Sequence, residues 1–152
     1  MTLWRISNHP TLDGRGGLRA SARWHTRGQR IVYASPNPAT ALLEILVHAE
    51  IDWRDVPVSF RFLEIAAPAG IQSETVERAR LSSGWESRPE STRRIGDEWL
   101  RSGRTALLLV PCVIVPETYN ILFNPLHRDA VEVAIVRMHR HAFDRRLAAT
   151  GQ

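Results

Sequence analysis

The stretch "RWHTRGQRIVYASPNPATALLEILVHAE", residues 23–50, has the pattern of a loop, a strand and a helix in succession. "RIVYAS" is typical of a short strand. In the segment that follows, Asn37 is a suitable N-cap and Pro38 fits the first helical position. Four apolar residues then recur at the spacing of a core-facing helical stripe: Leu42, Ile45, Leu46 and Ala49. We therefore expect a strand and a helix joined by a capped turn.

Three polar residues stand out in this stretch: Arg23, Tyr33 and Glu44. Glu44 shares a helix face with Ala41 and His48, so its side chain need not point into the core. Tyr33 ends the strand and can wall a cleft that Arg23 reaches from the loop. A guanidinium for an anion, an aromatic face for a planar heterocycle and a carboxylate for a sugar hydroxyl would suit a dinucleotide. The alternative is structural: a surface ion pair between Arg23 and Glu44, with Tyr33 half-buried in the strand.

The rest of the chain predicts an α+β fold. Strands are expected in "TLWRIS", "PVSFRFLEIAAP", "TALLLVPCVIVP" and "VEVAIVRMH", and a second helix from near Ser87 to Gly103. "ETVERARL" is interpreted as a short helix or turn, and "ETYNILFNPLHRDA" as a connector. Strands and helices do not alternate, so mixed or antiparallel sheets with two main helices are expected rather than a doubly wound sheet. One domain over residues 1–152 fits this length.

The composition bears on whether the protein enters a membrane or is exported. With 43% hydrophobic and 24% charged residues, the chain has the balance of a soluble globular protein. No apolar run approaches the ~20 residues that span a bilayer, and the first residues lack the pattern of an export signal. The single cysteine, Cys112, cannot form an internal disulfide. We expect a cytoplasmic protein without membrane contact.

The basic residues favour small anionic ligands over nucleic acid. All 20 are arginines, and 16 acidic residues leave a formal charge of only +4. The arginines are scattered, without a basic stripe interleaved with aromatic residues, so no direct contact with nucleic acid is expected. A guanidinium is a fixed, permanently charged fork that suits phosphate or carboxylate.

Two other chemistries deserve comparison. Cys112 could act as a nucleophile with His48 or His127, but it lies in an apolar run, where thiols are usually inert. His139 and His141, with Asp144 nearby, lack the spacing of a zinc site and fit a solvated strand end better. We therefore expect no metal. Trp85 and Trp99 are interpreted as core residues. The glycine-rich loop "DGRGG", residues 13–17, is not a known phosphate-binding motif but could close over a ligand.

Five motifs in order resemble the RES-domain toxins of bacterial RES–Xre toxin–antitoxin pairs. They are "WRI", "ARWHTRGQRIVYAS", "ATALLEILVH", "GDEWLRSGRTALLLVPCVIVPETYNILFNPLH" and "FDRRL", and they span nearly the whole chain. The resemblance implies a fold like that of ADP-ribosyltransferases, with NAD+ as a substrate and no bound cofactor. It also implies a helix-turn-helix antitoxin of the Xre kind that places a C-terminal segment over the active site.

The resemblance assigns roles residue by residue. Glu44 would hydrogen-bond the ribose 2′-hydroxyl and stabilise an oxocarbenium-like state. Arg23 and Arg5 would grip the pyrophosphate, and Tyr33 would pack on the nicotinamide ring. The asparagines of "NILFNP" match an Asn-rich segment of the family and are expected to bind NAD+: Asn120 and Asn124.

Two positions depart from the family pattern. Cys112 stands in "VPC", where the family usually has "VPS", and we expect it to fill the place of that serine in the cleft. A thiol is a weaker hydrogen-bond donor than a hydroxyl. If the serine only orients a group of the site, activity should survive; if it donates to a developing charge, the transition state should lose ~1–3 kcal/mol of stabilisation. His25 follows "RW", where the family usually has asparagine, and is interpreted as a tolerated loop residue.

The function implied is a toxin that depletes NAD+ by cleaving the nicotinamide–ribose bond, with water or inorganic phosphate as acceptor. An alternative is an ADP-ribosyltransferase that modifies a protein target. An RNA-binding or RNA-cleaving toxin is a more distant alternative.

Overall fold

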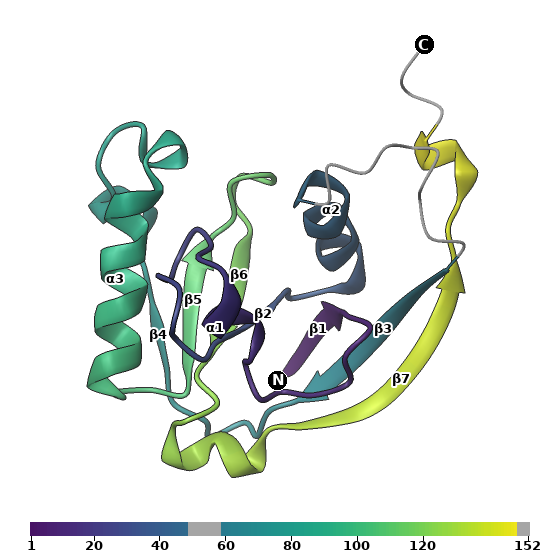
Figure 1. Cartoon of the computed structure of the whole chain (residues 1–152), viewed down its shortest axis with the longest axis horizontal. Coiled ribbons are helices and arrows are strands. Elements are labelled where there is room, and N and C mark those ends of the chain that lie inside the picture. The colour runs from purple at the N-terminus through teal and green to yellow at the C-terminus, as the bar shows by residue number, and fades with distance from the viewer. Residues whose placement is uncertain (49–58, 149–152) are drawn as a thin grey trace.

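The computed structural model describes residues 1–48 and 59–148, whose strands form two sheets (Figure 1). The first sheet is antiparallel with the order β1-β3-β7, formed by Thr2–Ile6, Ser59–Ala66 and Ala134–Ala142. The second sheet has the order β2-β6-β5-β4, formed by Val32–Ala34, Tyr119–Phe123, Leu107–Pro111 and Ser73–Thr75. Only the β4–β5 pair is parallel, which makes this sheet mixed. The expected α+β fold with mixed and antiparallel sheets is confirmed.

Both expected helices form, with the predicted caps. Helix α2 spans Pro38–His48, and the Thr40 amide donates to Asn37 Oδ1 at 2.8 Å. Helix α3 spans Pro89–Ser102 and ends at Gly103, whose φ of +56° suits a residue without a Cβ. Within the described residues the shorter helices are α1 and four 3-10 turns: Gly16–Arg19, Arg78–Arg80, Trp85–Ser87, Arg128–Glu132 and Arg145–Ala148. No helix within the described residues is both long and apolar enough to cross a membrane.

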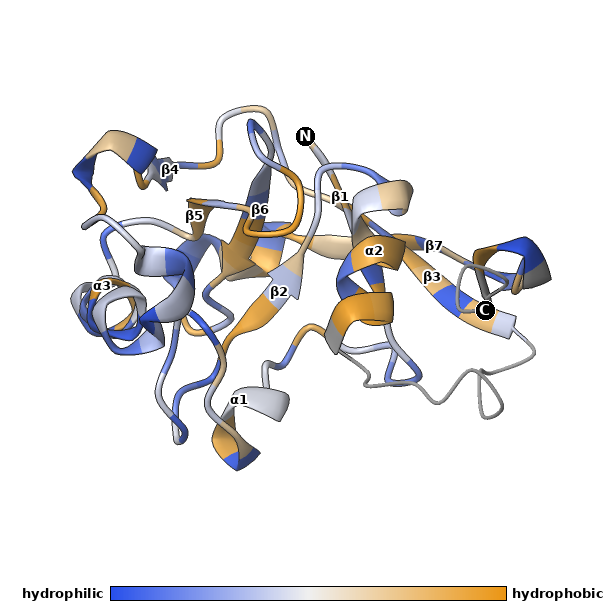
Figure 2. Ribbon diagram, turned by 90° about the horizontal axis from the view of Figure 1, so that it is seen from above, coloured by the Kyte–Doolittle hydropathy of each residue, from blue (hydrophilic) through white to orange (hydrophobic). Residues whose placement is uncertain are grey.

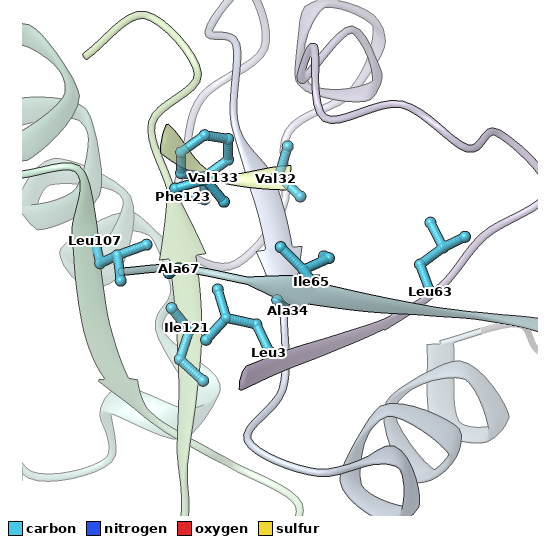
Figure 3. Packing of buried hydrophobic residues seen from close by; sticks show 10 residues of the cluster. All are labelled: Leu3, Val32, Ala34, Leu63, Ile65, Ala67, Leu107, Ile121, Phe123 and Val133. Atoms are coloured by element: carbon cyan, nitrogen blue, oxygen red, sulfur yellow. The ribbon is translucent and has the colours of Figure 1, made fainter. Parts of the chain in front are cut away.

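Both faces of the four-stranded sheet are buried, so this sheet lies at the centre of the molecule. Successive residues of a strand point to opposite faces, and in β5 Leu107 packs toward the three-stranded sheet whereas Leu108 packs toward α3. The first face meets Leu3 and Ile65 of the other sheet (Figure 3), and Leu63 belongs to the same buried cluster. The second face is covered by three buried tryptophans, as expected for two of them: Trp24, Trp85 and Trp99. In Figure 2, β5 and β6 are mostly hydrophobic, whereas much of α3 is hydrophilic.

Two strands were not expected from the sequence. Strand β6 lies in the segment interpreted as a connector, and it pairs with both β2 and β5. It is five residues long and buried toward its end on both faces, so it lacks the alternation that reveals a half-exposed strand. Strand β4 has only three residues and opens the segment interpreted as a helix or turn, which continues into the 3-10 turn Arg78–Arg80.

Candidate functional site

A cavity of about 540 Å³ lies where the two sheets meet. Its walls come from β1, the loop before β2, β2 itself, α2, the segment after β5, and β6. Most of the residues expected from the sequence share this lining: Arg5, Arg23, Tyr33, Glu44 and Asn120. The volume lies in the range of pockets that enclose small molecules and cofactors.

The carboxylate of Glu44 is held by residues from two other parts of the fold. Asn120 Nδ2 donates to Glu44 Oε1 at 2.5 Å, and Cys112 Sγ donates to the same oxygen at 3.3 Å. Asn120 is itself oriented, because Ser35 Oγ donates to its Oδ1 at 3.2 Å. Helix α2 therefore presents Glu44 to the cavity, while β6 and the end of β5 fix the position of its carboxylate.

Cys112 is fully buried beside Glu44 and does not itself line the cavity. Its Sγ accepts from the Val115 amide at 3.3 Å while it donates to Glu44. Burial raises the pKa of the Cys112 thiol, and the neighbouring carboxylate raises it further. The thiol is thus neutral and acts as a donor. His127 Nδ1 accepts from the Asp129 amide in the turn after β6.

Tyr33 presents its ring to the cavity while its hydroxyl is bound within the protein. The hydroxyl accepts from the Trp24 amide at 3.2 Å and lies 2.9 Å from His25 Nδ1. Burial raises the pKa of the phenol well above its ordinary value. Tyr33 therefore stays protonated and supplies an aromatic wall rather than an acid or base.

His25 is not a tolerated loop residue, and that expectation was wrong. Its side chain is buried, lines the cavity, and joins Tyr33 to the Ala20 carbonyl, which lies 3.0 Å from Nε2. Burial lowers the pKa of the imidazole. Nothing in the sequence pairs position 25 with position 33, because the contact exists only once the loop turns back on the strand.

The two arginines of the cavity differ in their surroundings. Arg23 Nη1 donates to the Glu86 carbonyl at 2.8 Å, and its guanidinium lies 6.0 Å from the centre of the Trp85 ring. Arg5 is partly buried on β1, where burial lowers the pKa of its guanidinium and the charge of Asp13 opposes that shift. An arginine keeps its charge in such a site, so both residues can meet an anion in the cavity.

Helix α3 fixes the turn that carries Arg23. Thr92 Oγ1 donates to the Arg23 carbonyl at 2.5 Å, and Arg93 Nε donates to the Ala22 carbonyl at 2.8 Å. Asp97 accepts from the amide and the hydroxyl of Thr26 at 2.9 and 2.6 Å. Backbone groups of one short turn are therefore bound by three side chains of α3, which were not identified as site residues from the sequence.

Asn124 does not join the cavity, in contrast to the expectation that it binds NAD+. It is not among the residues that line the cavity, and its Oδ1 accepts from the Leu126 amide at 3.0 Å. Its backbone amide donates to the Ala106 carbonyl, and its carbonyl accepts from the His127 amide. Asn124 thus builds the turn after β6, whereas Asn120, on the strand itself, reaches Glu44.

The glycine-rich loop lines the cavity, whereas the two histidines of the expected strand end do not. Gly16 and Gly17 line the cavity, so the glycine-rich loop contributes to its wall. His139 and His141 lie on β7, outside the cavity lining, and His139 stacks on Phe62 with ring centres 5.5 Å apart. Among the described residues, no group of three or more His, Cys, Asp or Glu side chains could hold a metal ion.

Comparison with known proteins identifies the family. Residues 2–146 match the RES domain. The chain belongs to the RES-domain family. It is 46% identical over 138 residues to a protein of Pseudomonas putida named Toxin Res, covering 89% of this chain and 92% of that protein. It is 35% identical over 156 aligned positions to the Prs ADP-ribosylating toxin of a Sphingobium species, covering 96% of each. The expected membership among the RES-domain toxins of toxin–antitoxin systems is confirmed.

A solved structure shows the same fold. The match is to the crystal structure of the MbcT–MbcA toxin–antitoxin complex of M. tuberculosis, with a TM-score of 0.70. It covers 93% of this chain and 84% of that chain at 13% identity. At that identity the likeness concerns the fold alone.

Proposed function

We propose that this RES-domain toxin cleaves NAD+ at the bond between nicotinamide and ribose, with water or inorganic phosphate as acceptor. The observation that carries the proposal is the carboxylate of Glu44, fixed by Asn120 and Cys112 at the wall of a cavity of about 540 Å³. The same cavity offers an aromatic wall at Tyr33 and cationic groups at Arg5 and Arg23. These are the groups that a dinucleotide requires.

Each group has a distinct part in the reaction. As the C–N bond breaks, its electron pair leaves with nicotinamide and positive charge develops on the ribose. The Glu44 carboxylate stabilises that charge and binds the 2′-hydroxyl. The ring of Tyr33 packs on nicotinamide, and the arginines hold the pyrophosphate, so the reacting carbon is placed for attack by the acceptor. Nicotinamide leaves as a neutral molecule, so the step needs no strong general acid.

ADP-ribosylation of a protein is the second candidate, and one observation favours it: the Sphingobium relative, which covers 96% of this chain, is named for that activity. The cleavage step is the same in both reactions, and only the acceptor differs. An antitoxin of the Xre kind that covers the cavity in the cytoplasm is part of the proposal, supported by the toxin–antitoxin complex of the structural neighbour.

The substitution Glu44→Gln tests the proposal because it keeps the shape of the side chain and removes its charge. We expect NAD+ turnover to fall by about a thousandfold or more, as for other groups that stabilise transition-state charge. Growth inhibition should be lost with it, while the fold is kept. Glu98→Gln is the matched control, since Glu98 is exposed on α3 and outside the cavity lining.

The assay offers NAD+, total RNA and cell extract to the purified proteins. Consumption of NAD+ without a gain in protein mass supports hydrolysis or phosphorolysis, and a gain in protein mass supports ADP-ribosylation. Parent-like turnover in a folded Glu44→Gln protein, or loss of RNA while NAD+ stays intact, would overturn the proposal.

A further inference from the structure

A chain of hydrogen bonds behind Tyr33 fixes the protonation of His25. The Ala20 carbonyl can only accept, so the hydrogen of the imidazole lies on Nε2, 3.0 Å away, and donates to it. Nδ1 then carries a lone pair and accepts the phenolic hydrogen of Tyr33 across 2.9 Å. The phenolic oxygen in turn accepts from the Trp24 amide at 3.2 Å. Every donor in this chain meets one acceptor.

The surroundings of His25 keep the imidazole neutral. The side chain is only 2% exposed, and burial lowers its pKa. On α3, the charge of Asp97 favours a proton on His25 and the charge of Arg93 opposes one, while the phenol of Tyr33 on β2 is itself neutral. A second proton, on Nδ1, would make that nitrogen a donor facing the phenolic hydrogen, and the hydrogen bond from Tyr33 would be lost. The neutral form is therefore the one that fits the chain of hydrogen bonds.

We propose that His25 is a positioning residue that sets the orientation of the Tyr33 ring in the cavity by accepting its phenolic hydrogen. The two ring centres are 5.6 Å apart with an angle of 53° between their planes, so His25 contacts Tyr33 at its hydroxyl end rather than stacking on its ring. Because the hydroxyl is held there, Tyr33 offers a planar ligand its ring and not a hydrogen bond. The inference rests on the proposed function where it takes nicotinamide as that ligand.

Two substitutions separate the two nitrogens of His25. The side-chain amide of asparagine occupies the place of Nδ1, so His25→Asn keeps an acceptor for Tyr33 and loses the bond to Ala20. Glutamine reaches the place of Nε2, so His25→Gln keeps the bond to Ala20 and loses the acceptor for Tyr33. Both variants remove the imidazole and are similar in size and polarity. A purely structural part for His25 predicts the same outcome for both.

Steady-state kinetics with NAD+ give the first measurement. We expect His25→Gln to raise KM about five- to tenfold with little change in kcat, as for one neutral hydrogen bond that orders a binding wall. His25→Asn should restore most of the parent KM. Tyr33→Phe should raise KM at least as much as His25→Gln, because it also removes the acceptor of the Trp24 amide. Adding His25→Gln to Tyr33→Phe should cost nothing more, since the bond between the two side chains is already lost. Equal KM values for the two His25 variants would overturn the proposal.

A measurement without NAD+ keeps this inference separate from the proposed function. The protein has two tyrosines, Tyr33 and Tyr119, so ¹³Cζ-labelled tyrosine gives two NMR signals, which Tyr119→Phe assigns. The Tyr33 signal should move in His25→Gln and stay near its parent position in His25→Asn. An unchanged signal in both variants would exclude the hydrogen bond. A parent protein that leaves NAD+ intact would reject the proposed function, while this signal still decides the pairing of His25 with Tyr33.

Discussion

At residue 112 a thiol stands where the family pattern has a serine, and it makes two hydrogen bonds. Sγ accepts from the Val115 amide and donates to Glu44 Oε1, both at 3.3 Å. The stronger bond to the same oxygen comes from Asn120 at 2.5 Å. Position 112 therefore contributes a second donor to the carboxylate.

Cys112→Ser should fold and should turn over NAD+ at least as fast as the parent, because a hydroxyl of nearly the same volume donates a better hydrogen bond to Glu44. Cys112→Ala should be slower, since one donor to the carboxylate is lost, at a cost of about 1–3 kcal/mol. NAD+ consumption and melting temperature, measured on both variants, check this.

Other parts for Cys112 give different outcomes. A nucleophilic thiolate would make Cys112→Ser slower by orders of magnitude, because an unactivated hydroxyl attacks poorly. A core thiol without function would make serine destabilising through an unsatisfied hydroxyl and leave alanine tolerated. A Cys112→Ser protein that is stable but inactive is the result that contradicts the donor role.

The lining of the cavity was largely predictable residue by residue, but the contacts among these residues were not. The resemblance gave Arg5, Arg23, Tyr33, Glu44 and Asn120, which line one cavity, and Cys112, which lies behind Glu44. It also gave Asn124, which binds the backbone of a turn instead. A motif shows which residue types recur. The direction in which the side chains of Asn120 and Asn124 point depends on the pleat of β6 and on the turn that follows it. His25 was missed because its partner, Tyr33, is contacted only in the folded loop.

At the scale of elements, α3 approaches the Arg23 turn so closely that only glycine fits at position 96. A Cβ added at Gly96 would overlap the Trp24 carbonyl oxygen, a backbone atom that cannot move aside without the turn. Three side chains of α3 bind the same turn: Thr92, Arg93 and Asp97. The distance between α3 and the turn therefore sets the position of Arg23 and of the loop that holds His25.

Gly96→Ala should move the turn and lower both stability and activity. Crowding a packed contact costs about 1–3 kcal/mol, and the shift of Arg23 should raise KM for NAD+. Gly70→Ala is the control, because a Cβ there meets no atom within 4 Å. Urea unfolding and NAD+ kinetics on both proteins give the comparison. A Gly96→Ala protein with parent-like stability and KM would show that α3 does not position the turn.

The two main helices were easier to predict than strands β4 and β6, for a physical reason. The α2 cap, Asn37 with Pro38, and the α3 stop at Gly103 are local signals that sit in the sequence next to the element they define. Strand β6 forms because β2 and β5 flank it, and one of these partners, β2, lies far away along the chain. Its five residues carry no signal of their own that distinguishes a buried strand from an apolar connector.

At the scale of the whole molecule, the cavity depends on how the two sheets pack. β1 comes from one sheet, β2 and β6 come from the other, and all three line the cavity. A pair of backbone hydrogen bonds between Trp4 and Ser35, at 2.8 and 2.7 Å, ties the sheets together beside it. The shared core continues through Leu3, Leu63 and Ile65.

Leu63→Ala should therefore weaken the fold and the site together. Leu63 is 0% exposed on β3, and loss of a buried leucine costs about 2–5 kcal/mol. Its register partner on β7, Met138, is 55% exposed, so Met138→Ala is a matched control that should cost about 1 kcal/mol or less. Because both sheets share one core, urea unfolding followed by tryptophan fluorescence and by circular dichroism should give one coincident transition in every variant. Two separated transitions in Leu63→Ala would show that the sheets unfold independently, and this would contradict the shared core.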